Sequence, residues 1–199
     1  MNIMLDLETW GLTPGSDIRS IGACVFAPET GLVHDGSLGT IRPFYSATAT
    51  PEALPLTRDP ETVKWWNDQS EKAQAAFANP ADLWSACYSF NHWIWSVCGS
   101  RERFENWTAD EGIRIWCKGP HFDVSILAAI YRAIKMPVPW HYRSPRDMRT
   151  VVDIAKITKD EERAMFTGTP HHALDDAISQ AKVVCEAFKR LRLTDGREA

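Results

Sequence analysis

The first nine residues contain the feature that most constrains this fold: two acids inside an otherwise apolar segment of strand composition. Asp6 and Glu8 lie in the run Met4-Leu5-Asp6-Leu7-Glu8-Thr9. Side chains at positions i and i+2 of a β-strand point to the same face, so the two carboxylates share one face. Burying two like charges side by side is costly unless a cation joins them. The segment therefore predicts a divalent metal site, with further ligands from elsewhere in the chain.

The composition is that of an ordinary globular protein, with 44% hydrophobic and 24% charged residues. A length of 199 residues suits one domain with one sizeable core, so we expect residues 1–199 to form a single domain. The net charge is −4, so no global positive field attracts nucleic acid. This balance disfavours a non-catalytic DNA-binding module, but not an enzyme whose carboxylates are neutralised by metal.

The cysteines and the apolar segments predict a cytoplasmic protein that does not enter a membrane. Five scattered cysteines without a CxxC pair are typical of reduced, mostly buried thiols. The N-terminus has no basic region followed by an apolar stretch, so we expect no signal peptide. No apolar run is long enough to span a bilayer. Nine tryptophans are many for this length, and core packing and a possible homodimer account for them.

Apolar periodicity and turn signals predict the elements in chain order. Strands are expected at 3–7, at 18–26, within 32–42 and at 112–117, with room for one more short strand within 136–145. Helices are expected from Asp59-Pro60 to about 77, from Asn79-Pro80 to about 98, and at 121–135, 146–157 and 173 onward. Loops are expected at 43–58, 100–112 and 159–163. This order predicts an α/β fold with a mixed central sheet flanked by helices.

Two later segments carry the other candidate ligands. Asp123 follows the predicted strand at 112–117, and His171 and Asp176 lie at the start of the last helix. Hard cations such as Mg²⁺ or Mn²⁺ prefer carboxylates and water to thiolates. Four carboxylates around two ions about 4 Å apart would stabilise both the attacking and the leaving oxygen of a phosphoryl transfer. A histidine, whose ordinary pKa is about 6.5, could accept the proton of the attacking water.

Each segment alone has a plainer structural interpretation. An isolated acid pair on a strand can face solvent, and Asp123 or Asp176 alone would be a first-turn acid favoured by the helix dipole. His171 alone would be a loop residue or a helix cap, and His121 and His172 keep that interpretation. The metal-site hypothesis depends on all three segments occurring in one chain.

Together these segments resemble the DEDDh exonucleases, which are named for four acids and a histidine. The matching runs are Asp6-Leu7-Glu8-Thr9, Gly119-Pro120-His121-Phe122-Asp123, and His171-x-Ala173-x-x-Asp176-Ala177, with further matches at 17–23, 59–66, 146–153 and 173–181. The resemblance covers nearly the whole chain and points to a subgroup of small bacterial and phage 3′-to-5′ exoribonucleases. It implies a ribonuclease H-like fold. One departure is the bulky, charge-bearing segment Lys118–His121 ahead of Asp123.

The resemblance also implies a role for each matching residue. Four carboxylates would bind two divalent ions, Mg²⁺ or Mn²⁺: Asp6, Glu8, Asp123 and Asp176. His171 would be the general base. The implied substrate contacts are Thr9, Trp10, Leu12, Trp66 and Arg149. Of these, Trp66 would either stack on a base or pack in the core, and Arg149 would either reach a phosphate or form a surface ion pair. The substrate would be a single-stranded 3′ end, and the product a nucleoside monophosphate.

Three alternative functions follow from the same residues. An exonuclease acting on DNA ends would differ in how it treats the 2′-hydroxyl, which no single residue here reveals. A non-catalytic nucleic-acid-binding protein of the same fold would retain unused converging carboxylates, which are destabilising. A nucleotide-pool hydrolase would cleave free nucleotides but not oligomers. RNA is the predicted substrate.

Overall fold

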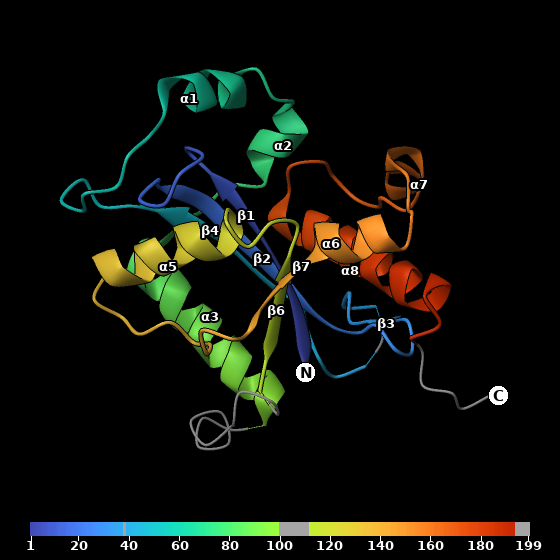
Figure 1. Ribbon diagram of the computed structural model, residues 1–199. Coiled ribbons are helices and arrows are strands. Elements are labelled where there is room, and N and C mark those ends of the chain that lie inside the picture. Colours follow the sequence, from blue (N-terminus) through green and yellow to red (C-terminus); the bar gives the residue numbers. More distant parts are fainter. Residues whose placement is uncertain (38, 100–111, 194–199) are drawn as a thin grey trace.

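A mixed β-sheet forms the centre of the molecule (Figure 1). The computed structural model describes residues 1–37, 39–99 and 112–193, so nearly all of the predicted irregular segment 100–112 lies outside the described residues. The strands are β1 (Asn2–Thr9), β2 (Ile18–Ala27), β3 (Leu32–Val33), β4 (Phe44–Ala49), β5 (Ala81–Asp82), β6 (Arg114–Cys117) and β7 (Pro145–Asp147). Their order is β5-β4-β2-β1-β6-β7, with β3 paired to β2. The predicted mixed sheet with flanking helices is confirmed.

Strand β1 is central in the sheet and carries the acid pair. It is antiparallel to β2 and parallel to β6. In the β1–β2 register, Asp6 is opposite Gly22 and Glu8 is opposite Ser20. A central strand is covered on both faces, which explains why the residues around the acids are almost continuously apolar.

Helices cover both faces of the sheet (Figure 1). The odd-numbered residues of β1 pack in one core with α3 (Leu83–Cys98) and α5 (Asp123–Ala133). Met4 packs in a second core with α6 (Met148–Ile154) and α8 (Ala173–Arg190). Because side chains alternate along a strand, the two acids share the face of Met4 and point toward α8.

The segment predicted as one helix from residue 60 to about 77 forms two short helices instead. The start is as predicted, because the Asp59 side chain accepts a hydrogen bond from the Thr62 backbone N–H, and α1 spans Pro60–Asn67. Asp68 then ends α1, and Ser70 caps a new helix, α2 (Glu71–Ala75). A serine at this position can satisfy a free backbone N–H, so it starts a new helix rather than continuing the old one.

Two predicted loops contain regular structure. Within 43–58, strand β4 pairs with β2 along four residues, with Ser20 opposite Ala47. Its stability comes from this pairing, which a search for apolar runs does not detect. Within 159–163, helix α7 (Lys159–Ala164) begins at a capping box in which Thr158 and Glu161 satisfy each other's backbone N–H groups.

The cysteines and tryptophans are mostly internal. All five cysteines are buried, as predicted. Trp66, Trp116 and Trp140 are buried, whereas Trp65 and Trp84 are exposed. The predicted homodimer and cytoplasmic location stay predictions. Across the described residues, none of the helices has the length and apolar character needed to cross a bilayer.

Candidate active site

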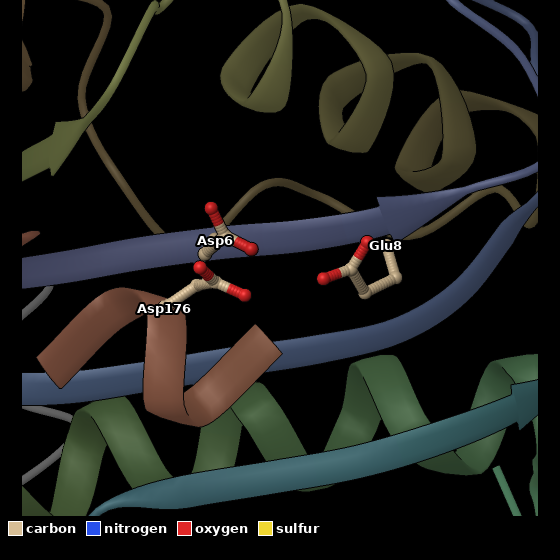
Figure 2. Close-up of side chains that lie close together, drawn as sticks. All are labelled: Asp6, Glu8 and Asp176. Carbon is tan, nitrogen blue, oxygen red and sulfur yellow. The ribbon is translucent and has the colours of Figure 1, made fainter. Parts of the chain in front are cut away.

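Three carboxylates from distant parts of the chain converge on one face of the sheet (Figure 2). Asp6 and Glu8 project from β1, and Asp176 projects from the first turn of α8. One oxygen from each lies within 4.8 Å of the other two. Glu8 is buried, and the other two are half-buried. The predicted convergence of the first and last segments is therefore present.

A close backbone approach brings α8 over the acids of β1. A Cβ atom placed on Gly22 would lie 2.2 Å from the carbonyl carbon of Ala173, so only glycine admits the start of α8 here. His172 caps the helix, because its Nδ1 accepts a hydrogen bond from the Asp175 N–H at 3.4 Å. Its ring stacks on Tyr45 at 4.3 Å, which ties the cap to β4. These contacts place the first turn of α8, and with it Asp176.

Asp123 lies beside the three converging carboxylates rather than among them. It is the first residue of α5 and is buried, and its Oδ1 accepts a hydrogen bond from the Leu7 N–H at 3.2 Å. It is not one of the three acids whose oxygens lie within 4.8 Å of one another. Its charge is nevertheless the strongest electrostatic influence that raises the pKa of Asp6.

Burial raises the pKa of every one of these acids, and repulsion from the neighbouring carboxylates adds to the rise for Asp6 and Glu8. Burial is the main cause, and it raises the pKa of Glu8 to about 8, of Asp123 to about 7 and of Asp176 to about 6. The pKa of Asp6 is raised well above its ordinary value by burial and then by the other three carboxylates. A group of acids this hard to ionise is stabilised by a cation.

The oxygens at the site suit a hard divalent cation. Asp176 Oδ2 is buried and has no hydrogen-bond partner among the described residues, so it retains a free lone pair. Asp6 Oδ1 is held by the Gln180 Nε2 amide at 2.7 Å. The three converging groups are all carboxylates, and oxygen ligands of this kind are those that Mg²⁺ and Mn²⁺ prefer.

His171 lies next to the carboxylates in a loop of unusual backbone conformation. Its φ of 62° is in the left-handed region. Its ring is nearly perpendicular to the rings of Trp65 and Trp66, with centroids 4.8 and 6.1 Å away. Burial lowers the pKa of His171, so the neutral imidazole is favoured. His171 and Asp176 line the same cavity.

A cavity of about 490 Å³ opens beside Glu8. The predicted substrate residues that line it are Thr9, Leu12 and Trp66. Leu12 is 71% exposed and forms an outer wall. Trp65, for which base stacking and core packing were equally weighted from the sequence, also lines this cavity, as does Phe122, which the sequence did not mark as a substrate contact.

The two neighbouring tryptophans near the end of α1, Trp65 and Trp66, have different environments. Trp66 is only 2% exposed, and its indole N–H donates to the Thr9 carbonyl at 2.8 Å. Trp65 is 43% exposed on the cavity wall. Packing therefore accounts for most of the Trp66 ring, and Trp65 is the one with a face available to a ligand.

The remaining two predicted contacts, Trp10 and Arg149, lie at the edges of the site. The Trp10 ring is within 4.4 Å of the Arg19 guanidinium and 4.9 Å of the Arg58 guanidinium, and it does not line the cavity beside Glu8. Arg149 is exposed on α6, with its guanidinium against Gly119. Its charge favours the ionised form of Asp123 and so partly offsets the rise in pKa that burial causes.

Sequence reasoning missed two residues that support the carboxylates. Gln180 lies one turn beyond Asp176, so the helical i+4 spacing could have identified it. Arg19 is buried on β2, and its guanidinium lies over the Phe77 ring at 3.6 Å and the Trp66 ring at 4.3 Å. Its charge lowers the pKa of Glu8 against the effect of burial. Arg19 could have been identified from the sequence as the lone arginine in a strand that is otherwise apolar.

Solved structures share this architecture at low sequence identity. The nuclease domain of 3′hExo, a DEDDh family member bound to rAMP, has a TM-score of 0.60 and 11% identity over 94% of this chain and 91% of that one. Cell-death related nuclease 4 (CRN-4) has a TM-score of 0.57 and 9% identity over 94% and 63%. Pop2p of S. pombe, in a form with Mg²⁺ and Mn²⁺ bound, has a TM-score of 0.53 and 13% identity over 95% and 83%. These likenesses establish the ribonuclease H-like fold.

The fold and the match to a family model define the class: the chain is a DEDDh-type 3′-5′ exonuclease. Residues 1–188 match the family described as the 3′-5′ exoribonuclease Rv2179c-like domain, and the chain belongs to that family. It is a hydrolytic enzyme. No curated protein matches the sequence.

Proposed function

We propose that this chain releases nucleoside monophosphates one at a time from the 3′ end of single-stranded RNA. The observation that carries the proposal is the convergence of Asp6, Glu8 and Asp176 beside a cavity of about 490 Å³. The family description, which names an exoribonuclease, favours RNA over DNA. The family match covers residues 1–188, which supports one exonuclease domain across residues 1–199.

The carboxylates would hold two divalent ions, Mg²⁺ or Mn²⁺. Asp6 is central, because the charges of Glu8, Asp123 and Asp176 all raise its pKa. Glu8 and Asp176 would complete one site, and Asp123 would hold or orient the second ion from the start of α5. Bound ions of this kind activate water and stabilise both oxygens of an in-line displacement at phosphorus. The Gln180 amide would keep the Asp6 carboxylate in a fixed orientation.

His171 would accept the proton of the attacking water. Burial favours the neutral imidazole, which is the form a general base requires. Its ring lines a cavity together with Asp176, so proton acceptor and carboxylate face the same space. The perpendicular packing of the imidazole with the Trp65 and Trp66 rings would orient it.

The terminal nucleotide would occupy the cavity beside Glu8. Leu12 and the exposed face of Trp65 are apolar surfaces that suit a base of any sequence. Thr9 follows Glu8 directly and lines the same cavity, where it would meet the sugar of the terminal nucleotide. Arg149 would attract the phosphate chain from the edge of the site.

The proposal is tested by incubating 5′-labelled single-stranded RNA and DNA of one sequence with the protein and Mg²⁺ or Mn²⁺. Stepwise shortening from the 3′ end, faster on RNA, is expected, with nucleoside monophosphates as the product. Faster shortening of the DNA strand would favour the deoxyribonuclease alternative. Cleavage of free nucleotides without cleavage of oligomers would favour the nucleotide-pool alternative.

The variant Asp6→Asn tests whether the carboxylates perform the reaction. It removes one charge from the centre of the cluster and keeps the shape of the side chain. We expect loss of detectable cleavage with an unchanged circular dichroism spectrum. Wild-type turnover by this variant would refute the assignment of Asp6.

A further inference from the structure

A second cavity opens on the other side of the carboxylates. It has a volume of about 630 Å³, within the range of roughly 300–1,000 Å³ typical of ligand pockets. Glu8 lines the first cavity and Asp176 lines the second. Figure 2 shows these two carboxylates at opposite ends of the group, with Asp6 close to Asp176. Residues of α1 line the first cavity, and residues of α7 and α8 line the second. Helix α1 lies at the upper left of Figure 1, whereas α7 and α8 lie on the right.

The second cavity continues into a smaller one of about 300 Å³. The two share four lining residues: Lys118, Met148, Lys159 and Glu162. The smaller cavity reaches Arg149 on α6. We call the two together the α7 trough. It extends from the carboxylates of the active site to the outer surface of α6.

Two cations of the trough form no ion pair within the described part of the chain, although the charge of Lys118 lowers the pKa of Asp176 and that of Arg149 lowers the pKa of Asp123. Lys118 lines both of its cavities, and Arg149 lines the smaller one. The charge of Lys159 is already neutralised, since its Nζ lies 2.7 Å from Glu162 Oε1. Arg163 pairs with Asp160 at 2.9 Å. Lys118, where the two cavities join, and Arg149, in the smaller one, can therefore contact an anionic ligand without breaking an ion pair.

The trough also offers apolar surface and an open hydrogen-bond acceptor. Phe166 lines it, is half-buried, and stacks on no other aromatic ring of the described residues. Met148 and Val183 form apolar surface around it. Gln180 Oε1 is buried, has no hydrogen-bond partner among the described residues and belongs to a side chain that lines the trough. Aromatic surface, polar acceptor and free cations are what a nucleotide requires.

We propose that the α7 trough binds the nucleotide on the 5′ side of the scissile phosphate, with its base on Phe166 and its own 5′-phosphate near Lys118. This inference rests on the proposed exonuclease function. The scissile phosphate would lie at the carboxylates, between the terminal nucleotide in the first cavity and its neighbour in the trough. Substrates that lack this second nucleotide would lose the contribution of the trough to binding.

Three substrates separate binding in the trough from the reaction itself. The p-nitrophenyl ester of uridine 5′-monophosphate contains the terminal nucleotide and the scissile phosphate but no second nucleotide. A 5′-phosphorylated diribonucleotide contains both nucleotides, and its abasic analogue lacks only the base at the second position. Because one stacked base contributes on the order of tenfold or more, we expect kcat/KM to fall about tenfold from the dinucleotide to the abasic analogue.

The variant Phe166→Ala tests whether the ring carries this difference. We expect the variant to lower kcat/KM for the dinucleotide and to respond no further to loss of the base, as interacting partners do in a double-mutant cycle. Phe166→Tyr, which keeps an aromatic ring, should restore the dependence on the base.

The variant Lys118→Gln tests the phosphate contact and should raise KM for the phosphorylated dinucleotide. Lys189→Gln, which removes a charge on α8 outside the trough, is its matched control.

The outcomes for the trough and for the exonuclease function are distinct. If kcat/KM falls equally for wild type and for Phe166→Ala when the base is removed, the proposal for the trough is overturned and the exonuclease function stands. A wild-type enzyme that cleaves neither the ester nor the dinucleotide would overturn both.

Discussion

Gln180 connects the last helix of the chain to the first strand. Its amide nitrogen donates to Asp6 across 174 positions of sequence. A donor on one oxygen of a carboxylate restricts the rotation of that side chain, so it determines which lone pairs face the neighbouring acids. Residues that orient metal ligands in this way commonly change metal affinity by about 10- to 100-fold when removed.

We therefore expect Gln180→Ala to weaken Mn²⁺ binding by about tenfold or more while the chain remains folded. Gln180→Glu replaces the amide donor with a further carboxylate. We therefore expect it still to bind Mn²⁺ and to lose activity for a different reason than Gln180→Ala does. Calorimetric titration with Mn²⁺ measures the first effect. Lys189→Gln on the same helix serves as a control, and equal Mn²⁺ affinity of Gln180→Ala and wild type would contradict the positioning role.

The neighbouring tryptophans allow binding and packing to be separated. Trp65→Ala removes an exposed ring from the cavity beside Glu8, so we expect the affinity for a nucleoside monophosphate to fall by about 1–3 kcal/mol with little loss of stability. Trp66→Ala removes a buried ring and its hydrogen bond to Thr9, so it should lower the free energy of unfolding by about 3–5 kcal/mol. Chemical unfolding and nucleotide titration of both variants check this. An undisturbed affinity in Trp65→Ala would remove that ring from the binding surface.

At the scale of elements, helix starts were easier to predict than helix ends. Asp59 with Pro60 caps α1 as predicted. The next helix was predicted to start at Asn79-Pro80, but Ala81–Asp82 forms β5 and Asp82 caps α3 three residues later, because its side chain accepts the Ser85 N–H. The pairing of β4 with β2 depends on a neighbour that is distant in the sequence. The end of α1 at Asp68 is local, but the Ser70 cap that follows it lies inside what reads as one continuous helix. The capping box of α7 was visible as Thr158-x-x-Glu161 and was missed because its charged residues suggested a loop.

Helix α7 is expected to depend on that capping box. Thr158→Ala removes the oxygen that accepts the Glu161 N–H, which should lower stability by about 1 kcal/mol. Because the helix loses its cap, the amide protons of α7, which forms a wall of the trough, should exchange faster in this variant. Hydrogen exchange followed by mass spectrometry measures the effect, with Thr158→Ser, which keeps the hydroxyl, as control. Unaltered exchange of α7 would show that its contacts, such as the Arg190–Glu161 ion pair at 2.6 Å, hold it without the cap.

At the scale of the whole molecule, the acidic site makes the stability of the folded state depend on pH. The pKa of Glu8 is about 8, that of Asp123 about 7 and that of Asp176 about 6 in the metal-free fold, all above the ordinary values of these groups. The folded state therefore holds protons that the unfolded state has released. By linkage, the extra bound protons stabilise the folded state fully below about pH 4, and this stabilisation is lost as the pH rises through the folded pKa values.

We expect the melting temperature in EDTA to fall between about pH 5 and pH 8, and the rise caused by Mn²⁺ to grow over the same interval, since a cation binds the ionised carboxylates. Thermal melts with EDTA and with Mn²⁺ measure both trends. The double variant Glu8→Gln/Asp176→Asn should show a flatter pH profile and a smaller response to Mn²⁺. An equal Mn²⁺ effect at every pH would contradict these pKa values, and no effect at all would favour the non-catalytic alternative.

The sequence by itself determined the chemistry of the site and the face on which it lies. The i, i+2 spacing of Asp6 and Glu8 sets their common direction on any strand, and a helix that starts near His172 must place Asp176 in its first turn. Only the tertiary structure decided how these segments meet. Gly22 admits the start of α8, and packing buries Trp66 while it leaves Trp65 exposed. Local spacing governs direction within an element, whereas the approach of two elements depends on the shapes of surfaces that lie far apart in the chain.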